Sequence, residues 1–298
     1  MKRYECYIKS LFLMILFFYS SHLALAQYNS AGIKVGVSNY SGDLDPDPRI
    51  NIMREFKPAI GIFGRHQFND YFGIRAGFDY CQISGNDDNN ADTSRQKRNL
   101  SFKSNIFELN LLGECFFLGY QPYNLERIWS PYVFMGVSMF YFNPKALYKG
   151  NWVELQPLGT EGQGLASFPD REKYKRVQLS IPFGGGLIFA LNEAWNIGIE
   201  LGMRYTFTDY LDDVSLTYAD YYELLNNNGE LSAALSNRIG EYFGSTEPMT
   251  VPAGTGRGTP KNKDWYAIGG ITLTYNFLDT GLSGVRKIFR KKTGCPTF

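Results

Sequence analysis

The sequence predicts an all-β protein in which eight long antiparallel strands close into a transmembrane barrel. The first observation is a period of two, because apolar residues alternate with glycine or polar residues over eight segments. The second is length: the strong segments run for roughly nine to fourteen residues, enough for a tilted strand to cross a bilayer. The third is that short turns alternate with long polar stretches, a pattern typical of outer-membrane barrels.

Composition agrees with this fold class. The 298-residue chain contains 21 Tyr, 23 Phe and 31 Gly, and 30 basic residues balance 29 acidic ones to a formal net charge of +1. A nucleic-acid-binding domain would show a basic patch or stripe, so the balanced charge argues against that class. Beyond the N-terminal segment, no apolar run approaches the roughly 20 residues that a membrane-spanning helix needs.

Residues 1–26 have the pattern of a secretory signal peptide. A basic start precedes an apolar run at 11–19, and Ala24-Leu25-Ala26 matches the small-x-small cleavage pattern. The alternative is a retained anchor helix, for which this apolar run is too short. We therefore expect an exported chain that begins at Gln27.

Eight strands are expected in chain order. Their ranges are 33–37, 60–68, 72–80, 107–117, 132–142, 177–191, 195–207 and 265–277. The clearest is 195–207, where Trp195, Ile197, Ile199 and Leu201 lie on one face and Glu200 lies on the other. The segment 132–142 is apolar on both faces, which leaves its orientation open.

The connections assign the two ends of the barrel. Short turns are expected at Asn69-Asp70 and Asn192-Glu193, and a medium one at 121–127. Long polar stretches fill 41–56, 85–104, 143–175 and 209–263. With an even number of strands, both termini fall on the short-turn, periplasmic side. The domain organisation is then a signal peptide (1–26), a barrel (27–277) and a basic periplasmic tail (278–298).

The inner face of the barrel is expected to carry charge. Opposite the apolar face lie four cationic and four anionic residues: Lys34, Arg65, Arg75, Asp79, Glu108, Glu114, Glu200 and Arg204. Because side chains can fill an eight-stranded barrel, we expect a charge-balanced plug in which Glu200 pairs with Arg75 or Arg204. The alternative is a path for protons or ions. An arginine at lipid-facing Ile199 should be costly, and one at inward Thr206 far less so.

The sequence predicts no catalytic, cofactor or metal site. His66 falls on the apolar face, away from any Ser nucleophile. The run Gly184-Gly185-Gly186 lacks the lysine of a phosphate loop and is better explained by strand bending. A calcium site at Asp209, Asp212 and Asp213 would need regular ligand spacing, so a solvated loop is the simpler interpretation.

The tail is the candidate partner-binding segment. Its basic residues, cysteine and terminal aromatic are Arg286, Lys287, Arg290, Lys291, Lys292, Cys295 and Phe298. Cys81 and Cys115 face opposite sides of neighbouring strands, so they cannot reach disulfide geometry. Cys295 stands beyond the barrel beside lysines that favour the thiolate. It is expected to form a mixed disulfide with a periplasmic partner; the alternative is a free thiol in a basic end near anionic headgroups.

Several segments together resemble the PorG-type outer-membrane β-barrels of the type IX secretion system. They are Val37–Leu44, Phe68–Gly77, Asp209–Ser215, Leu235–Arg238, Arg257-Gly258, Asn262–Tyr266 and the Cys-Pro-x-Phe end. The resemblance implies a non-enzymatic subunit of a Gram-negative protein-transport machine that also serves gliding motility in some bacteria. Its implied partners are the periplasmic ring proteins, a PorK-type lipoprotein and a PorN-type protein.

Two other functions remain open at this point. The chain is alternatively an autonomous outer-membrane barrel that acts in adhesion or envelope stability through its extracellular loops, and the tail would then be dispensable. A lipid-modifying enzyme would require a polar triad at one rim, and the sequence offers no such triad.

Overall fold

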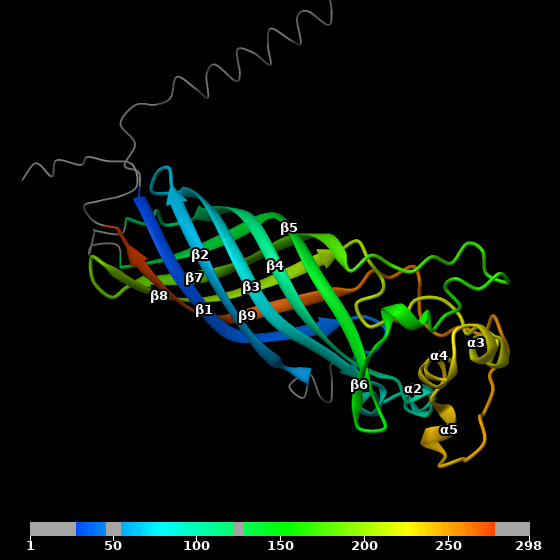
Figure 1. Cartoon of the computed structure of the whole chain (residues 1–298). Helices are drawn as coiled ribbons and strands as arrows, with labels where there is room; N and C mark the ends of the chain where they lie inside the picture. Colours follow the sequence, from blue (N-terminus) through cyan, green and yellow to red (C-terminus); the bar gives the residue numbers. More distant parts are fainter. Residues whose placement is uncertain (1–27, 46–54, 122–127, 278–298) are drawn as a thin grey trace, which may run out of the picture.

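The computed structural model describes residues 28–45, 55–121 and 128–277. Within this part of the chain, eight antiparallel strands close into a barrel (Figure 1), in the order β4-β3-β2-β1-β9-β8-β7-β5 with β5 pairing back to β4. Their bounds are β1 (Tyr28–Ser41), β2 (Lys57–Gln67), β3 (Phe72–Asn86), β4 (Ser101–Phe116), β5 (Trp129–Tyr148), β7 (Val177–Ala190), β8 (Trp195–Thr206) and β9 (Trp265–Asn276). Each of the eight predicted segments is thus a barrel strand.

The period of two sets the direction of each side chain. On β4, Leu109 is 54% exposed whereas its neighbour Glu108 is completely buried, as alternation across a strand requires. The orientation of β5, open from the sequence, is also fixed: Phe134 points inward and Val137 points outward. Aromatic residues line the inside of this strand at both ends of the lumen: Tyr132 and Phe134 belong to the turn-side cluster, and Phe140 and Phe142 to the cluster beneath the cap.

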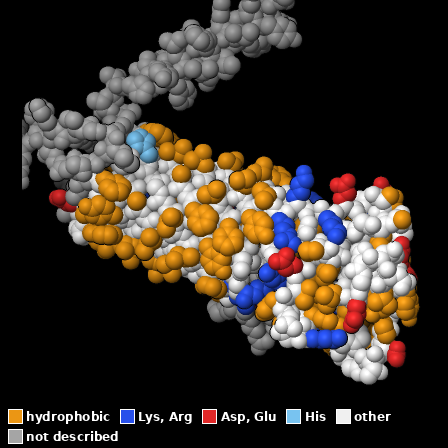
Figure 2. Space-filling view, viewed as in Figure 1, with side chains coloured by type: hydrophobic (Ala, Val, Ile, Leu, Met, Phe, Trp, Pro, Cys, Tyr) orange, Lys and Arg blue, Asp and Glu red, His pale blue; other side chains and the backbone are white. Residues whose placement is uncertain are grey.

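An apolar belt encircles the outside of the barrel. It is made of outward, exposed side chains: Ile33, Val35, Ile60, Ile62, Leu109, Leu111, Val137, Met139, Leu179, Ile199, Leu201 and Ile271. Figure 2 shows hydrophobic side chains covering the barrel wall on the side in view. Exposed apolar area of this extent marks a surface that meets lipid. Among the described residues, no helix has the length and apolar character needed to cross a membrane.

Two asparagines close the short turns by the same contacts. Asn69 Oδ1 accepts hydrogen bonds from the backbone N–H groups of Tyr71 and Phe72, each at 2.8 Å. Asn192 Oδ1 accepts two equivalent bonds, including one from Trp195 N at 2.9 Å. β1 begins and β9 ends beside these turns, at the end of the barrel opposite the helices (Figure 1).

The long connections contain more structure than the sequence indicated. The predicted loop at 143–175 is wrong in part, because β5 continues to Tyr148 and returns as β6 (Asn151–Glu154), outside the barrel wall. Further elements cover the opposite end: η2 (Asp87–Asn89), α2 (Thr93–Arg98), η3 (Gln156–Leu158), α3 (Tyr221–Asn227), α4 (Glu230–Ser236) and α5 (Ile239–Tyr242). We call the described parts of the four long connections, 42–45, 87–100, 155–176 and 207–264, the cap.

Candidate functional site

The eight predicted inner charges all lie buried in the lumen. They form one continuous series of alternating sign, which we call the lumen chain: Arg65, Glu114, Arg75, Glu200, Lys34, Asp79, Arg204 and Glu108. Each inner charge therefore has at least one partner of opposite sign. The predicted charge-balanced interior is confirmed, and the geometry assigns its pairings.

The turn-side half of the lumen chain is built on two arginines. Arg65 Nε lies 2.5 Å from Glu114 Oε2, and Arg75 Nε lies 3.2 Å from the other oxygen of the same carboxylate. Arg75 Nη1 then contacts Glu200 Oε2 at 2.5 Å, which confirms Arg75, one of the two predicted partners of Glu200. Tyr132 also donates to Glu200 Oε2, at 2.7 Å.

The cap-side half continues through lysine and a third arginine. Lys34 Nζ lies 2.9 Å from Asp79 Oδ1 and 3.6 Å from Glu200 Oε1, so it joins the two halves. Arg204 Nε lies 3.1 Å from Glu108 Oε2, and its Nη2 lies 3.5 Å from Asp79. Buried charges are tolerated only when paired and hydrogen-bonded, and the lumen chain meets both conditions.

Aromatic residues close the lumen at its turn side. A buried cluster fills this end: Leu112, Phe116, Tyr120, Tyr132, Phe134 and Ile188. The guanidinium of Arg65 stands 5.5 Å from the ring centre of Phe116, and that of Arg75 stands 5.0 Å from the Phe134 ring. Cation–π contacts of this kind join the charged and apolar parts of the filling. Side chains thus occupy the lumen from the turn-side rim upward.

The cap closes the opposite mouth. Leu211 is completely buried, and its N–H donates to Asp264 Oδ2 at 2.9 Å. Tyr40, at the end of β1, donates to Asp212 Oδ2 at 2.7 Å. It also contacts the Phe102 ring edge-on, at a centroid distance of 4.9 Å. The predicted solvated loop at 209–213 is therefore wrong, because this segment is packed over the barrel mouth.

The Arg257 side chain joins two of the long connections, 155–176 and 207–264, at the centre of the cap. Its Nη1 donates to Glu161 Oε1 at 3.0 Å and to the Asp213 carbonyl at 2.6 Å, while Nε donates to the Ser236 carbonyl at 3.1 Å. Glu161, itself completely buried, also accepts the N–H of Ser215 at 3.0 Å. A charge-assisted network of this kind holds distant segments in one arrangement.

Arg98 extends the network to the first two long connections. Its guanidinium makes two hydrogen bonds to the Asp87 carboxylate, at 2.8 and 2.7 Å. It also donates to the backbone carbonyls of Asp43 and Arg257, at 3.0 and 2.5 Å. All four long connections therefore meet in one folded unit. Sequence reasoning missed Arg98, Glu161 and Arg257 as structural residues, because irregular segments have no period that would single them out.

The cap should gain stability as the pH falls. Burial raises the pKa of Asp213 to about 6 despite the neighbouring Arg257 guanidinium, and burial also raises the pKa of Asp209 to about 6. Because an unfolded aspartate titrates near pH ~3.9, the folded cap binds protons more tightly, and this stabilisation is lost as the pH rises through about 6. Hydrogen-exchange protection factors for residues 209–217 should be higher near pH 4.5 than at pH 7.5. Protection that increases with pH would contradict this assignment.

The carboxylates considered for calcium serve the protein itself. Asp213 accepts from Thr160 and Tyr174, at 2.5 and 2.7 Å, and Asp209 accepts from Ser215 at 2.7 Å. In the ranges that the structure describes, no group of three or more His, Cys, Asp or Glu residues is arranged to hold a metal ion.

The glycine run lies within a strand. Gly184 is in β7, where a Cβ atom would lie 2.2 Å from the Leu201 carbonyl oxygen and 2.7 Å from the Phe134 ring. Gly186 is similarly confined, with the Ile199 carbonyl oxygen at 2.4 Å. Small residues are required here because an aromatic side chain from β5 packs against this part of the wall.

The remaining sequence-predicted residues separate into two groups. His66 lies on the outward face near the turn side, as predicted. Its Nδ1 atom lies 2.7 Å from Asn29 Oδ1. Cys81 is buried inside and Cys115 is half-buried on the outward face, and neither is in a disulfide. The seven tail residues predicted to bind a partner, including Cys295, lie outside the described residues.

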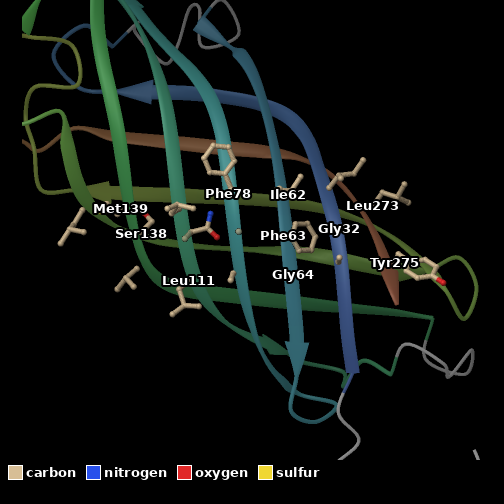
Figure 3. A pocket seen from close by; sticks show the side chains of 18 of the residues that line it. Gly32, Ile62, Phe63, Gly64, Phe78, Leu111, Ser138, Met139, Leu273 and Tyr275 are labelled. Carbon is tan, nitrogen blue, oxygen red and sulfur yellow. The ribbon is translucent and has the colours of Figure 1, made fainter. Parts of the chain in front are cut away.

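A hollow of about 1000 Å³ lies along the barrel wall and is lined mainly by outward apolar side chains. Its labelled side chains come from several strands, among them Ile62, Leu111 and Tyr275 (Figure 3). The hollow has a simple origin, because the small residues Ala31, Gly64 and Ala76 stand opposite one another across β1, β2 and β3. We assign it to the lipid-facing surface.

Comparisons with solved structures find similarity at low sequence identity and assign no function. Similar solved structures include Ail, the attachment invasion locus protein of Yersinia pestis, at 10% identity, with 85% of this chain and 100% of that chain covered and a TM-score of 0.38. They also include Neisserial surface protein A (9% identity, 84% and 97% covered, TM-score 0.38). A third is OprG from Pseudomonas aeruginosa (9% identity, 85% and 98% covered, TM-score 0.35). No curated protein matches the sequence.

One family model does match. It covers residues 9–233, from β1 through β8 and into the helices of the cap. Its description states no activity, so it identifies relatives rather than a function. The chain belongs to the family described as a domain of unknown function, DUF6089.

Proposed function

We propose that this chain is a non-enzymatic anchor in the outer membrane: a sealed barrel that holds a periplasmic assembly to the membrane. The observation that carries the proposal is the lumen chain, in which eight inner charges pair with one another. A barrel filled in this way transports nothing through its own lumen. Its function would then depend on its position in the membrane and on contacts made at its two ends.

By the resemblance to PorG-type barrels, the assembly is the type IX secretion machinery, with or without a role in gliding. The partners would be the PorK-type ring lipoprotein and the PorN-type periplasmic protein. Support for this placement comes from the basic tail at 278–298, which follows β9 at the turn side of the barrel. The tail combines five basic residues with one cysteine: Arg286, Lys287, Arg290, Lys291, Lys292 and Cys295.

The test is a crosslinking pull-down from outer membranes, with and without residues 278–298. The full chain should recover ring proteins, and the truncated chain should lose them while still inserting as a folded barrel. A matched variant with the five basic tail residues changed to glutamine separates charge from length. Equal recovery by the full and truncated chains would contradict the anchoring role.

A covalent link is expected at Cys295. Non-reducing electrophoresis of membranes should show a high-mass band that disappears with reductant and in Cys295→Ser. Cys81 is buried within the barrel, so Cys81→Ser should leave the band unchanged. A wild-type chain that runs only as a monomer, or a band that survives Cys295→Ser, would contradict the covalent link. Docking would then depend on the basic residues alone.

The cap favours a second candidate function. Four long connections form one packed unit around Arg98 and Arg257, so the loops present a defined surface. An autonomous barrel acting in adhesion or envelope stability would use this surface and would not need the tail. This second function predicts that truncation of 278–298 has no effect on cell adhesion or envelope integrity. Deletion of the cap should instead have a strong effect on both.

A further inference from the structure

The outward side chains of β4 and β5 become progressively more polar toward the cap. Paired residues in register are Leu111 with Val137, Leu109 with Met139, Phe107 with Tyr141, Asn105 with Asn143, and Lys103 with Lys145. The apolar pairs belong to the belt, the next pair is aromatic, then comes an amide pair, and the last pair is cationic. Each step advances about 7 Å along the strand, so the lysine pair stands about 14 Å along the strands beyond the aromatic pair.

A pocket of about 290 Å³ lies at this border. Its lining includes both lysines, the aromatic residues Phe107, Tyr141 and Trp152, and the amides above them. Lys103 Nζ stands 5.4 Å from the centre of the Trp152 ring. Figure 2 shows Lys and Arg side chains gathered between the hydrophobic barrel wall and the cap.

The charges of this pocket are not balanced. Lys145 Nζ lies 3.3 Å from Glu154 Oε1, and Arg176 Nη2 lies 2.8 Å from the other oxygen of that carboxylate. For Lys103, the described residues offer no carboxylate within 4 Å. Lys145 and Arg176 therefore share the Glu154 carboxylate, and Lys103 is left without one.

Two further features indicate a missing anion. Lys103 and Lys145 are directly opposite across β4 and β5, an arrangement of like charges that destabilises a strand pair. Arg176 Nε is a buried donor for which the described residues provide no acceptor. The repulsion between the lysines would be relieved by a phosphate group bound between them.

We propose that this pocket binds the phosphate of an anionic membrane lipid in the leaflet on the cap side. The lipid is the occupant that the geometry favours, because below the amide pair the aromatic and apolar pairs of the same two strands lead into the belt where acyl chains would lie. The aromatic pair Phe107 and Tyr141 lies between the lysines and the belt, where aromatic residues mark the membrane interface. The inference rests on the proposed outer-membrane placement and is independent of any partner of the tail.

Native mass spectrometry of the full chain in detergent tests the proposal, with diphosphoryl lipid A as the probe and phosphatidylcholine as the neutral comparison. Lipid A should bind, and K103Q/K145Q should lower its affinity about 30-fold, equivalent to about 1 kcal/mol for each lysine near an anionic surface. K103R/K145R should retain binding. The control K97Q/K149Q removes two exposed charges, one in α2 and one in the turn between β5 and β6, and should leave binding unchanged.

Other outcomes overturn distinct parts of the account. Lipid A binding that is unchanged in K103Q/K145Q places the lipid elsewhere and refutes this site while leaving the membrane placement intact. A folded wild-type chain that binds neither lipid contradicts the placement itself. If inorganic phosphate binds alone and displaces lipid A, the pocket is a free-anion site and the lipid assignment is wrong.

Discussion

Replacing Arg204 with methionine is expected to lower the free energy of unfolding by about 3–5 kcal/mol, the usual cost of removing one partner from a buried ion pair. Arg204 is 1% exposed and contacts Glu108 and Asp79 in the middle of the barrel. Its loss leaves two carboxylates without their shared cation. Urea titration of the barrel in detergent, followed by tryptophan fluorescence, measures the change.

Two matched variants separate charge from packing. R204M/E108Q removes the carboxylate that Arg204 contacts at 3.1 Å, so it should recover part of the lost stability. Lys149→Met breaks an ion pair with Glu230 whose side chains are 70% and 72% exposed, and should cause little measurable change. If R204M unfolds at the same urea concentration as wild type, the lumen chain does not stabilise the barrel.

The second large effect is expected on the outer face. Ile199→Arg should destabilise the barrel by about 2–4 kcal/mol, because it places a cation near the middle of the bilayer. Val177→Arg is the control: both side chains are 53% exposed, but Val177 begins β7 at the cap side. A charge near the interface should cost only about 0–1 kcal/mol. Equal costs at both positions would contradict the membrane orientation of the belt.

Thr206 does not serve as the inexpensive inward position that the sequence suggested. It is completely buried, and its hydroxyl donates to the carbonyl of Asp264 at 2.7 Å and to that of Thr208 at 3.0 Å. An arginine there would break these bonds under the cap. The expectation failed because alternation indicates that a residue faces inward but says nothing of the space it finds there.

The wall of the barrel was predictable because it obeys one period. Glu108 and Leu109 fall on opposite faces from alternation alone, and the same rule placed all eight charges of the lumen chain. The pairings between these charges were harder to predict. Arg75 on β3 meets Glu200 on β8 across the lumen, and such meetings depend on strand tilt and stagger, which are properties of the closed barrel.

The cap could not be predicted by the same means. Arg257 and Glu161 are 96 positions apart in irregular segments, so neither period nor spacing relates them. Polar residues in a long connection were expected to be solvated, yet these are packed and paired. β6 was not predicted for a related reason, because a strand of four residues shows too little alternation to be recognised.

Single-channel recording in planar bilayers tests the central claim most directly. The lumen chain and the aromatic cluster around Phe116 and Tyr132 fill the barrel, and the cap covers its far mouth. The full chain, inserted and shown to be folded by its heat-modifiable mobility, should produce no stable current steps, whereas an open porin in the same membrane should produce them. Stable unitary currents from the wild-type protein would contradict a sealed barrel and show that ions pass through its lumen.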